Sequence, residues 1–355
     1  MNAKAKAKVL MAGPDLSLKG GIVSVVKGYL DAGIAERCDR FCYLGTVEGS
    51  NVPAKALSFV RSLWRFKAVV DDYDIVHLHT SKGGSLKRKT MLARVAVERG
   101  KKVIFHEHNG EFKRDFESGD QAFRDGVRSS FELADKVVVL SEEWRDYFAE
   151  NVCPVEKIVV LHNGVAVPAK PCSPCSHQDV LFLGRLDVNK SPDVLLRASR
   201  GMLEAHPEAK LLFGGDGHPE RYEALAQELG IAERCEFLGW VSGSEKERLF
   251  ERAAVYCLPS KHEGMPMGVL EAMAHGIPAI ATPVGGVPQI IQDGVNGFLI
   301  PVDGVDELSN VLAWVIGSPE LRERAGRAAY ECVSSCFNVA DSVATLMNLY
   351  DGIIR

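Results

Sequence analysis

Short apolar strands alternate with amphipathic helices along nearly the whole chain, and this order is the feature that most limits the possible folds. In the first half the predicted strands are 8–12, 41–46, 74–80, 102–108, 136–141 and 157–164. Their hydrophobic residues are nearly continuous, which is typical of parallel strands that are covered by helices on both faces. The pattern therefore predicts a doubly wound α/β domain.

A proline-rich stretch, 166–178, interrupts this alternation once and shows no helical or strand periodicity. Such a stretch is typical of a linker. The alternation then restarts, with predicted strands at 180–186, 209–217, 235–241, 254–260, 278–286 and 297–304. A chain of 355 residues usually exceeds one core. We therefore expect two tandem Rossmann-like domains, residues 1–165 and 179–337, with a final helix in 338–355.

The composition excludes several classes of protein. Hydrophobic residues make up 46% of the chain and charged residues 25%, which is ordinary for a globular protein. A net charge of -5 gives no reason to expect a nucleic-acid partner. No apolar run reaches the ~18 residues of a membrane span, and the N-terminus lacks the apolar core of a signal peptide. The nine cysteines show no disulfide-like spacing, so a cytoplasmic protein with reduced thiols is expected.

Two glutamates, Glu263 and Glu271, lie in the stretch EGMPMGVLEAMAHGIPAIATP. The pattern places Glu263 in a loop before a predicted helix at 267–275 and Glu271 about two turns inside that helix. The first turn of a helix has free N–H groups that favour an anion. Carboxylates beside it suit the hydroxyl groups of the same ligand. A ligand with a phosphate between polyols is a sugar nucleotide.

A second motif, GRLDVNK, follows the first strand of the predicted second domain. Arg185 and Lys190 lie on this loop, where two cations could converge on one anion, and Gly184 permits close approach of the backbone. The alternative is that both are solvated loop cations.

Two glycine motifs follow strands on the way to the next helix, and each has two interpretations. Gly20 and Gly21 precede the first helix, either as a plain turn or as amides that reach a phosphate or sugar. The sequence GGDG, which includes Gly215, is either a tight turn or a place where a nucleotide lies against the backbone. Its spacing is not that of a dinucleotide fingerprint.

Four histidines form two His-x-His pairs on neighbouring predicted strands. His77 and His79 share one face of their strand, and His106 and His108 share one face of the next. They could hold zinc, but core histidines with satisfied nitrogens are the simpler interpretation. His108 lies where its strand opens into a loop, so it is the candidate for a residue at a reacting centre.

Basic residues cluster in two places of the first half. The predicted helix 55–70 carries Arg61, Trp64 and Arg65, and Lys87-Arg88-Lys89 follows later. These residues form either solvated helix faces or a contact with an anionic membrane surface. The loop 81–84 between them, Ser-Lys-Gly-Gly, lacks the spacing of a P-loop but could bind a phosphate of an acceptor.

Taken together, these motifs resemble those of the retaining, nucleotide-sugar-dependent glycosyltransferases of family 4, which have the two-domain GT-B fold. The resemblance rests on Glu263 and Glu271 within EGMPMGVLEAMAHGIPAIAT, supported in order by the early Gly-Gly, GRLDVNK and GGDG. It implies two Rossmann-like domains that face across a cleft, with the last helix crossing back to the first domain.

The resemblance also implies a role for each matching residue. Arg185 and Lys190 would bind the donor diphosphate in place of a metal, and Gly21 would also approach the diphosphate. Glu271 would bind the ribose, and Glu263 would bind the donor sugar together with the backbone of Gly264, Met265, Pro266 and Met267. His108 would lie near the anomeric centre, and Trp240 and Val241 would lie near the base. No metal and no cofactor are expected besides the donor, a UDP-, GDP- or ADP-sugar. The HEHNGEF context of His108 is richer in histidine and acid than is usual in the family.

The expected function is therefore the retaining transfer of a sugar to a saccharide or lipid-linked acceptor, in polysaccharide or glycolipid biosynthesis. The enzyme would be cytoplasmic, with peripheral contact to the inner membrane surface. Two alternatives stay open: a zinc-dependent hydrolase that uses His77, His79, His106 and His108, and a catalytically silent partner subunit of the same fold.

Overall fold

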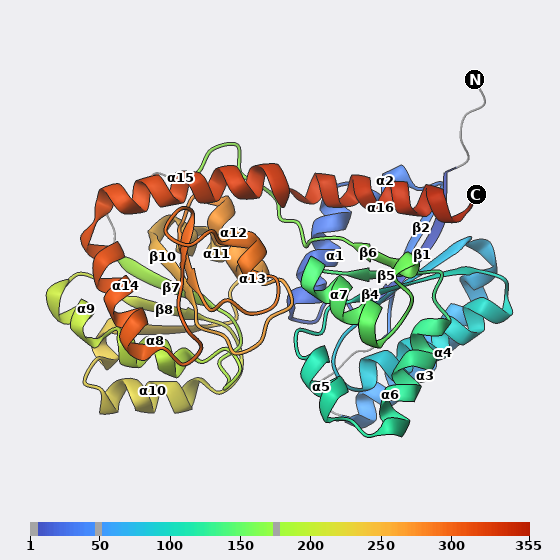
Figure 1. Ribbon diagram of the computed structural model, residues 1–355, viewed down its shortest axis with the longest axis horizontal. Helices are drawn as coiled ribbons and strands as arrows, with labels where there is room; N and C mark the ends of the chain where they lie inside the picture. The colour runs from blue at the N-terminus through green and yellow to red at the C-terminus, as the bar shows by residue number, and fades with distance from the viewer. Residues whose placement is uncertain (1–5, 47–51, 173–177) are drawn as a thin grey trace. The chain divides into compact units, whose positions relative to one another are not determined.

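The computed structural model describes residues 6–46, 52–172 and 178–355. The chain forms two compact units (Figure 1). Unit 1 comprises Met1–Gly164 together with Val339–Arg355, and unit 2 comprises Val165–Asn338. No helix in the described ranges is long and apolar enough to cross a membrane.

Unit 1 contains a parallel sheet with the strand order β2-β1-β3-β4-β5-β6. Its strands are β1 (Lys8–Gly13), β2 (Arg40–Gly45), β3 (Ile75–Thr80), β4 (Lys102–Glu107), β5 (Lys136–Val139) and β6 (Ile158–Val160). The order reverses direction between β1 and β3. In open α/β sheets, ligands bind at the carboxyl ends of the strands beside such a switch point.

The helices of unit 1 connect these strands, as the predicted alternation requires. They are α1 (Gly21–Asp31), α2 (Ile34–Arg37), α3 (Val52–Val69), α4 (Gly84–Glu98), α5 (Phe112–Ser118), α6 (Gln121–Glu132), α7 (Glu142–Asn151) and α16 (Val339–Ile353), with 3-10 turns η1 (Val70–Asp72) and η2 (Val155–Lys157).

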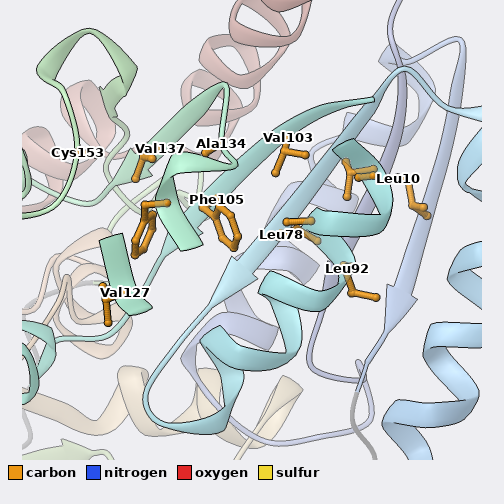
Figure 2. Packing of buried hydrophobic residues seen from close by; sticks show 14 of the residues in the cluster. Leu10, Leu78, Leu92, Val103, Phe105, Val127, Ala134, Val137 and Cys153 are labelled. Carbon is orange, nitrogen blue, oxygen red and sulfur yellow. The ribbon is translucent and has the colours of Figure 1, made fainter. Parts of the chain in front are cut away.

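The main core of unit 1 lies on one face of this sheet. Leu78 of β3 and Phe105 of β4 are fully buried there against Leu92 of α4 and Val127 of α6 (Figure 2). Every residue of β3 is buried, including the polar residues His77, His79 and Thr80. Because strand residues alternate between faces, the histidines of β3 point to the other face.

Unit 2 repeats this architecture with the strand order β12-β11-β10-β7-β8-β9, again parallel throughout. Its strands are β7 (Asp179–Leu183), β8 (Leu211–Gly214), β9 (Cys235–Gly239), β10 (Ala253–Leu258), β11 (Ala279–Ala281) and β12 (Gly297–Leu299). The order reverses between β7 and β10, so the loops after these two strands lie at the switch point of unit 2.

The helices of unit 2 lie between its strands and after the last of them. They are α8 (Pro192–Ala198), α9 (Arg200–Ala205), α10 (Pro219–Glu228), α11 (Gly243–Arg252), α12 (Met267–Ala274), α13 (Val287–Ile290), α14 (Val305–Gly317) and α15 (Pro319–Cys336), with the 3-10 turn η3 (Ala232–Arg234).

The last helix, α16, belongs to unit 1 although unit 2 separates it from the rest of that unit in sequence. Val343, Leu346 and Tyr350 are buried and follow one another at the spacing of a single helix face. A Cβ at Gly28 of α1 would lie 3.4 Å from Val339, so the two helices pack closely. The prediction that this helix returns to the first domain is confirmed.

Residues 166–172 of the predicted linker pack on the rest of unit 2. Tyr330 Oη donates a hydrogen bond to the carbonyl of Pro168 at 2.8 Å, and the amide of Cys172 donates to the carbonyl of His275 at 2.7 Å. Residues 173–177 of that linker lie outside the described residues.

Candidate active site

The GRLDVNK loop follows β7 and is shaped by its own aspartate. Oδ1 of Asp187 accepts hydrogen bonds from the amides of Asn189 and Lys190, both at 3.0 Å. An aspartate that bonds the backbone two and three residues ahead fixes a tight turn. Asp187, which we did not single out in the sequence, therefore sets the direction in which Lys190 leaves the loop.

Lys190 forms an ion pair with Glu263 at the switch point of unit 2. The distance from Nζ to Oε1 is 2.6 Å, and the side chains are 23% and 6% exposed. The backbone joins the same two loops, because the amide of Lys261 donates to the carbonyl of Asn189 at 2.7 Å. The resemblance assigned Lys190 and Glu263 to different parts of a donor, and the structure shows that they also bind each other.

Gly285 and Gly286, which we did not single out in the sequence, pack against the backbone of Glu263 and Gly264. Gly285 has φ 56°, and a Cβ there would overlap the carbonyl oxygen of Glu263. The amide of Gly286 donates to the carbonyl of Gly264 at 2.6 Å. Only a residue without a side chain fits this contact at Gly285. The Gly-Gly at the end of the strand predicted at 278–286 was the available signal.

The residues between Glu263 and α12 are mostly inside the protein. Gly264, Met265 and Pro266 are buried, whereas Met267, the first residue of α12, is partly exposed. Pro266 has no N–H, so the expectation that backbone amides from Gly264 to Met267 face a ligand is wrong at this position. No described side chain caps α12, so its first-turn amides have no side-chain acceptor in the part of the chain that the structure describes.

Glu271, inside α12, pairs with a lysine that the sequence analysis missed. Nζ of Lys246 on α11 lies 2.7 Å from Oε1 of Glu271, and both side chains are partly buried. Arg185, in contrast, extends from its loop: its side chain is 62% exposed, and its nearest carboxylate is Asp187 at 3.7 Å.

The GGDG motif packs its backbone against the GRLDVNK loop. A Cβ at Gly215 would overlap the carbonyl oxygen of Gly184, and the amide of Leu186 donates to the carbonyl of Asp216 at 2.6 Å. This packing explains Gly215 without a ligand. Of the pair expected near a base, Trp240 is 38% exposed and Val241 is buried.

Gly20 and Gly21 lie at the start of α1 in unit 1, after the carboxyl end of β1. Gly20 is the N-cap with φ 144°, and no side chain of the described residues caps the helix. A Cβ at either glycine would have no described heavy atom within 4 Å. The space on the Cβ side of these two glycines is therefore open among the described residues.

The four histidines form one stack on the face of β3 and β4 that faces away from the main core. His77 bonds to Tyr350 Oη of α16 at 2.6 Å and to His106 at 3.2 Å, and His79 bonds to Nε2 of His108 at 2.9 Å. The rings of His106 and His108 stack with centroids 4.2 Å apart. His108 is the partly exposed end of this stack, as predicted.

Burial keeps these imidazoles neutral. It lowers the pKa of His77 and that of His108 to about 3, and it lowers the pKa values of His79 and His106 well below the usual range. Ligand nitrogens of His77, His79 and His106 lie within 4.8 Å of one another. No carboxylate joins this group among the described residues. A metal ion here would have to be held by nitrogens of three fully buried side chains.

Comparisons with known proteins identify the family. The family model for glycosyl transferases group 1 matches residues 173–332, and the model for glycosyltransferase family 4 matches residues 34–167. The putative glycosyltransferase EpsD of Bacillus subtilis is 30% identical over 308 residues, which cover 81% of this chain and 79% of EpsD. The chain belongs to the group 1 glycosyltransferases.

A second relative of this glycosyltransferase is a D-inositol 3-phosphate glycosyltransferase of Kribbella flavida. It is 29% identical over 318 residues, which cover 81% of this chain and 74% of the relative. This family assignment favours sugar transfer over the zinc-dependent hydrolase that the paired histidines left open.

Solved structures share the fold of this glycosyltransferase. Anabaena HepE in complex with UDP-glucose superposes with a TM-score of 0.78 at 18% identity, covering 98% of this chain and 100% of HepE. Sucrose-phosphate synthase from Thermosynechococcus elongatus gives a TM-score of 0.80 at 19% identity, covering 98% and 99%. The predicted GT-B fold class is confirmed.

Proposed function

We propose that this glycosyltransferase moves a sugar from a nucleotide-diphosphate-sugar to a saccharide or lipid-linked acceptor, with retention and without a metal. The observation that carries the proposal is the ion pair between Lys190 and Glu263 at the β7/β10 switch point. It places one cation and one buried carboxylate together where α/β sheets bind ligands. The cation suits a diphosphate, and the carboxylate suits the hydroxyl groups of a sugar.

The donor contacts follow from this placement. Lys190 has three N–H donors and uses one for Glu263, so the others can take oxygens of a diphosphate. The exposed Arg185 adds a guanidinium that can bind phosphate oxygens bidentately. Glu263 then accepts hydrogen bonds from hydroxyls of the sugar, and Glu271, held by Lys246, accepts them from the ribose.

The reaction breaks the bond between the anomeric carbon and the diphosphate oxygen. Negative charge grows on the leaving diphosphate, and preorganised cations stabilise that charge. The acceptor hydroxyl attacks the same face of the sugar and gives its proton to the leaving phosphate. His108 is neutral in this scheme, because its pKa is lowered to about 3, and it acts as a hydrogen-bonding group at the anomeric centre.

Contact with a membrane surface belongs to the same proposal, and α3 carries it. Leu57, Val60 and Trp64 are exposed, Trp64 by 73%, and they lie at helical spacing on one face. Arg61 and Arg65 are exposed on the same helix. Exposed apolar groups between arginines suit the interface of an anionic bilayer, where a lipid-linked acceptor would lie. The enzyme would then work at the cytoplasmic face.

Nucleotide binding and turnover test the proposal. UDP, GDP and ADP sugars are screened by thermal shift, since a ligand at 100 times its dissociation constant adds about 2.7 kcal/mol to the free energy of unfolding. Lys190→Ala should abolish the response to the donor that binds. Lys210→Ala is the matched control, because Lys210 also pairs with a glutamate, Glu236 at 2.8 Å, but lies before β8 at the amino end of the sheet.

Two results would contradict the proposal. Full turnover by Lys190→Ala would show that Lys190 is not part of the site. Loss of activity on addition of EDTA would exclude a metal-independent mechanism. A protein that binds no nucleotide sugar at all would support the silent partner subunit instead.

A further inference from the structure

Lys89 of α4 is a buried lysine with a single neutral partner. Its side chain is 2% exposed, and Nζ lies 2.6 Å from Oγ1 of Thr46. That hydroxyl donates its own proton to the carbonyl of Gly13 at 2.8 Å, so it can only accept from Lys89. An ammonium group has three N–H donors, and only one of them has a partner among the described residues.

Arg88, the preceding residue, is a second cation without a described acceptor. It is partly buried, and its Nε is fully enclosed with no hydrogen-bond partner. The two residues are adjacent in α4, and burial together with the charge of Arg88 lowers the pKa of Lys89 to about 7. No carboxylate in the described ranges forms an ion pair with either of them.

Two adjacent, partly desolvated cations that have no counter-ion among the described residues are costly for that part of the fold. Burying a charge is unfavourable unless an opposite charge and hydrogen bonds compensate for it. The fold places this arrangement beside the β1/β3 switch point of unit 1: Thr46 follows β2, and α4 follows β3. An anionic ligand that binds here would supply the missing charge.

We propose that Lys89 and Arg88 form a phosphate-binding subsite in unit 1 and that it takes a phosphoryl group carried by the acceptor. The acceptor part of this inference rests on the proposed function, since unit 2 already provides the cations for the donor. Lys89 contributes two N–H donors that have no partner among the described residues, and Arg88 contributes a planar guanidinium that suits phosphate oxygens. Thr46 holds Lys89 in place.

The subsite changes the interpretation of the Lys87-Arg88-Lys89 run. As a solvated or membrane-facing patch, all three residues should be exposed. Only Lys87 is exposed, whereas Lys89 shares the buried face of α4 with Leu92, Ala93 and Ala96. Lys87 therefore serves as a control, because it carries the same charge two positions away on the solvent side of the helix.

The test measures phosphate binding by the full chain. The melting temperature is followed against inorganic phosphate, with chloride at matched ionic strength as the reference. Wild type and Lys87→Met should show the same phosphate-dependent rise. Lys89→Met should shift the half-saturating phosphate concentration upward by at least about tenfold, as expected for losing a charged hydrogen bond. Arg88→Gln should shift it in the same direction. Methionine matches the lysine stem, and far-UV circular dichroism verifies the fold of each variant.

UDP binding separates this subsite from the donor site. Calorimetry with UDP should give the same affinity for wild type and Lys89→Met. If wild type binds phosphate through Lys89 but binds no nucleotide, the proposed function fails and the phosphate subsite stands. If the phosphate response is unchanged in Lys89→Met, or is lost only in Lys190→Ala, the subsite is wrong.

Two phosphomonoesters then distinguish the sources of the phosphate. Glucose 6-phosphate represents a sugar phosphate, and farnesyl phosphate represents a lipid carrier. Tighter binding of one of them than of inorganic phosphate, lost in Lys89→Met, identifies the class of acceptor. If neither binds more tightly than inorganic phosphate, the assignment to the acceptor is overturned.

Discussion

Lys190 and Glu263 are 73 positions apart in the chain, yet their side chains meet at 2.6 Å between the loops that follow β7 and β10. The pair couples a cation, suited to a leaving diphosphate, to a carboxylate suited to sugar hydroxyls. Each group therefore positions the other, and removing either should disturb both functions.

Glu263→Gln should lower the donor-dependent rate by about 10²-fold, the usual loss when one preorganised electrostatic group is removed. The amide can still accept a hydrogen bond from a hydroxyl, but it no longer holds Lys190 by charge. The measurement is kcat/KM for donor consumption. Glu236→Gln, in the Lys210 pair at the other end of the sheet, should keep the wild-type rate. Equal rates for both variants would show that Glu263 has no special role.

Gly285→Ala should destabilise the protein more than Gly294→Ala. Both glycines have positive φ, 56° and 73°, so both substitutions cost about 1 kcal/mol in backbone strain. Only at Gly285 would the new Cβ also meet the carbonyl of Glu263, whereas no described atom lies within 4 Å at Gly294. Urea unfolding measures the difference. Similar midpoints for the two variants would mean that the Glu263 loop moves aside freely.

The histidine stack should make the protein sensitive to acid. The unfolded chain takes up protons near the ordinary histidine pKa of 6.5, while folded His77 and His108 do so near 3. The stabilising contribution is therefore complete above pH 6.5 and is lost as the pH falls from 6.5 toward 3. For each unit by which the folded and unfolded pKa values of a group differ, the group contributes about 1.4 kcal/mol to this pH-dependent change in unfolding free energy.

Removal of one stacked histidine checks this expectation. His77→Gln should show a shallower fall in unfolding free energy between pH 6.5 and 4 than wild type. His218→Gln removes a histidine whose side chain is 67% exposed and should keep the wild-type slope. A wild-type slope in His77→Gln would contradict the assignment.

Glu107 should have the opposite effect on stability. Burial raises its pKa to about 7, against hydrogen bonds from the amide of Asn109 at 2.7 Å and from Thr80 Oγ1 at 2.8 Å. The folded state thus binds this proton more tightly than the unfolded state. The stabilising contribution is complete below the ordinary pKa of 4.5 and is lost as the pH rises to 7.

Glu107→Gln should lack this loss, so its unfolding free energy should rise relative to wild type between pH 4.5 and 7. Chemical denaturation at a series of pH values measures the difference. Glu143→Gln, exposed on α7, is the control and should follow wild type. A constant difference between Glu107→Gln and wild type across this range would contradict a raised pKa.

The sequence predicts the sheets well because parallel, doubly covered strands have a strong local signature. Each predicted strand appears in the structure, although several are much shorter than predicted. The strands predicted at 157–164, 278–286 and 297–304 are reduced to β6 (Ile158–Val160), β11 (Ala279–Ala281) and β12 (Gly297–Leu299). The partners of Glu271 and Lys190 could not be predicted in the same way. Lys246 reaches Glu271 from another helix, and such contacts depend on how distant segments pack.

The burial of Lys89 did leave a sequence signal. Lys89, Leu92, Ala93 and Ala96 follow the i, i+3, i+4, i+7 spacing of one helix face, so the lysine stands on the apolar stripe of α4. Adjacent basic residues concealed this spacing. The Gly-Gly of 285–286 was likewise visible, but its role depends on the carbonyl of Glu263, whose position only the fold determines.

The membership of α16 in unit 1 has a consequence for biosynthesis. Unit 2 is continuous in sequence and has left the ribosome in full once Asn338 has been added and has cleared the exit tunnel. Unit 1 begins translation first but receives Val343, Leu346 and the Tyr350 partner of His77 last. The order in which the two domains can mature during translation is therefore the reverse of the order in which they start.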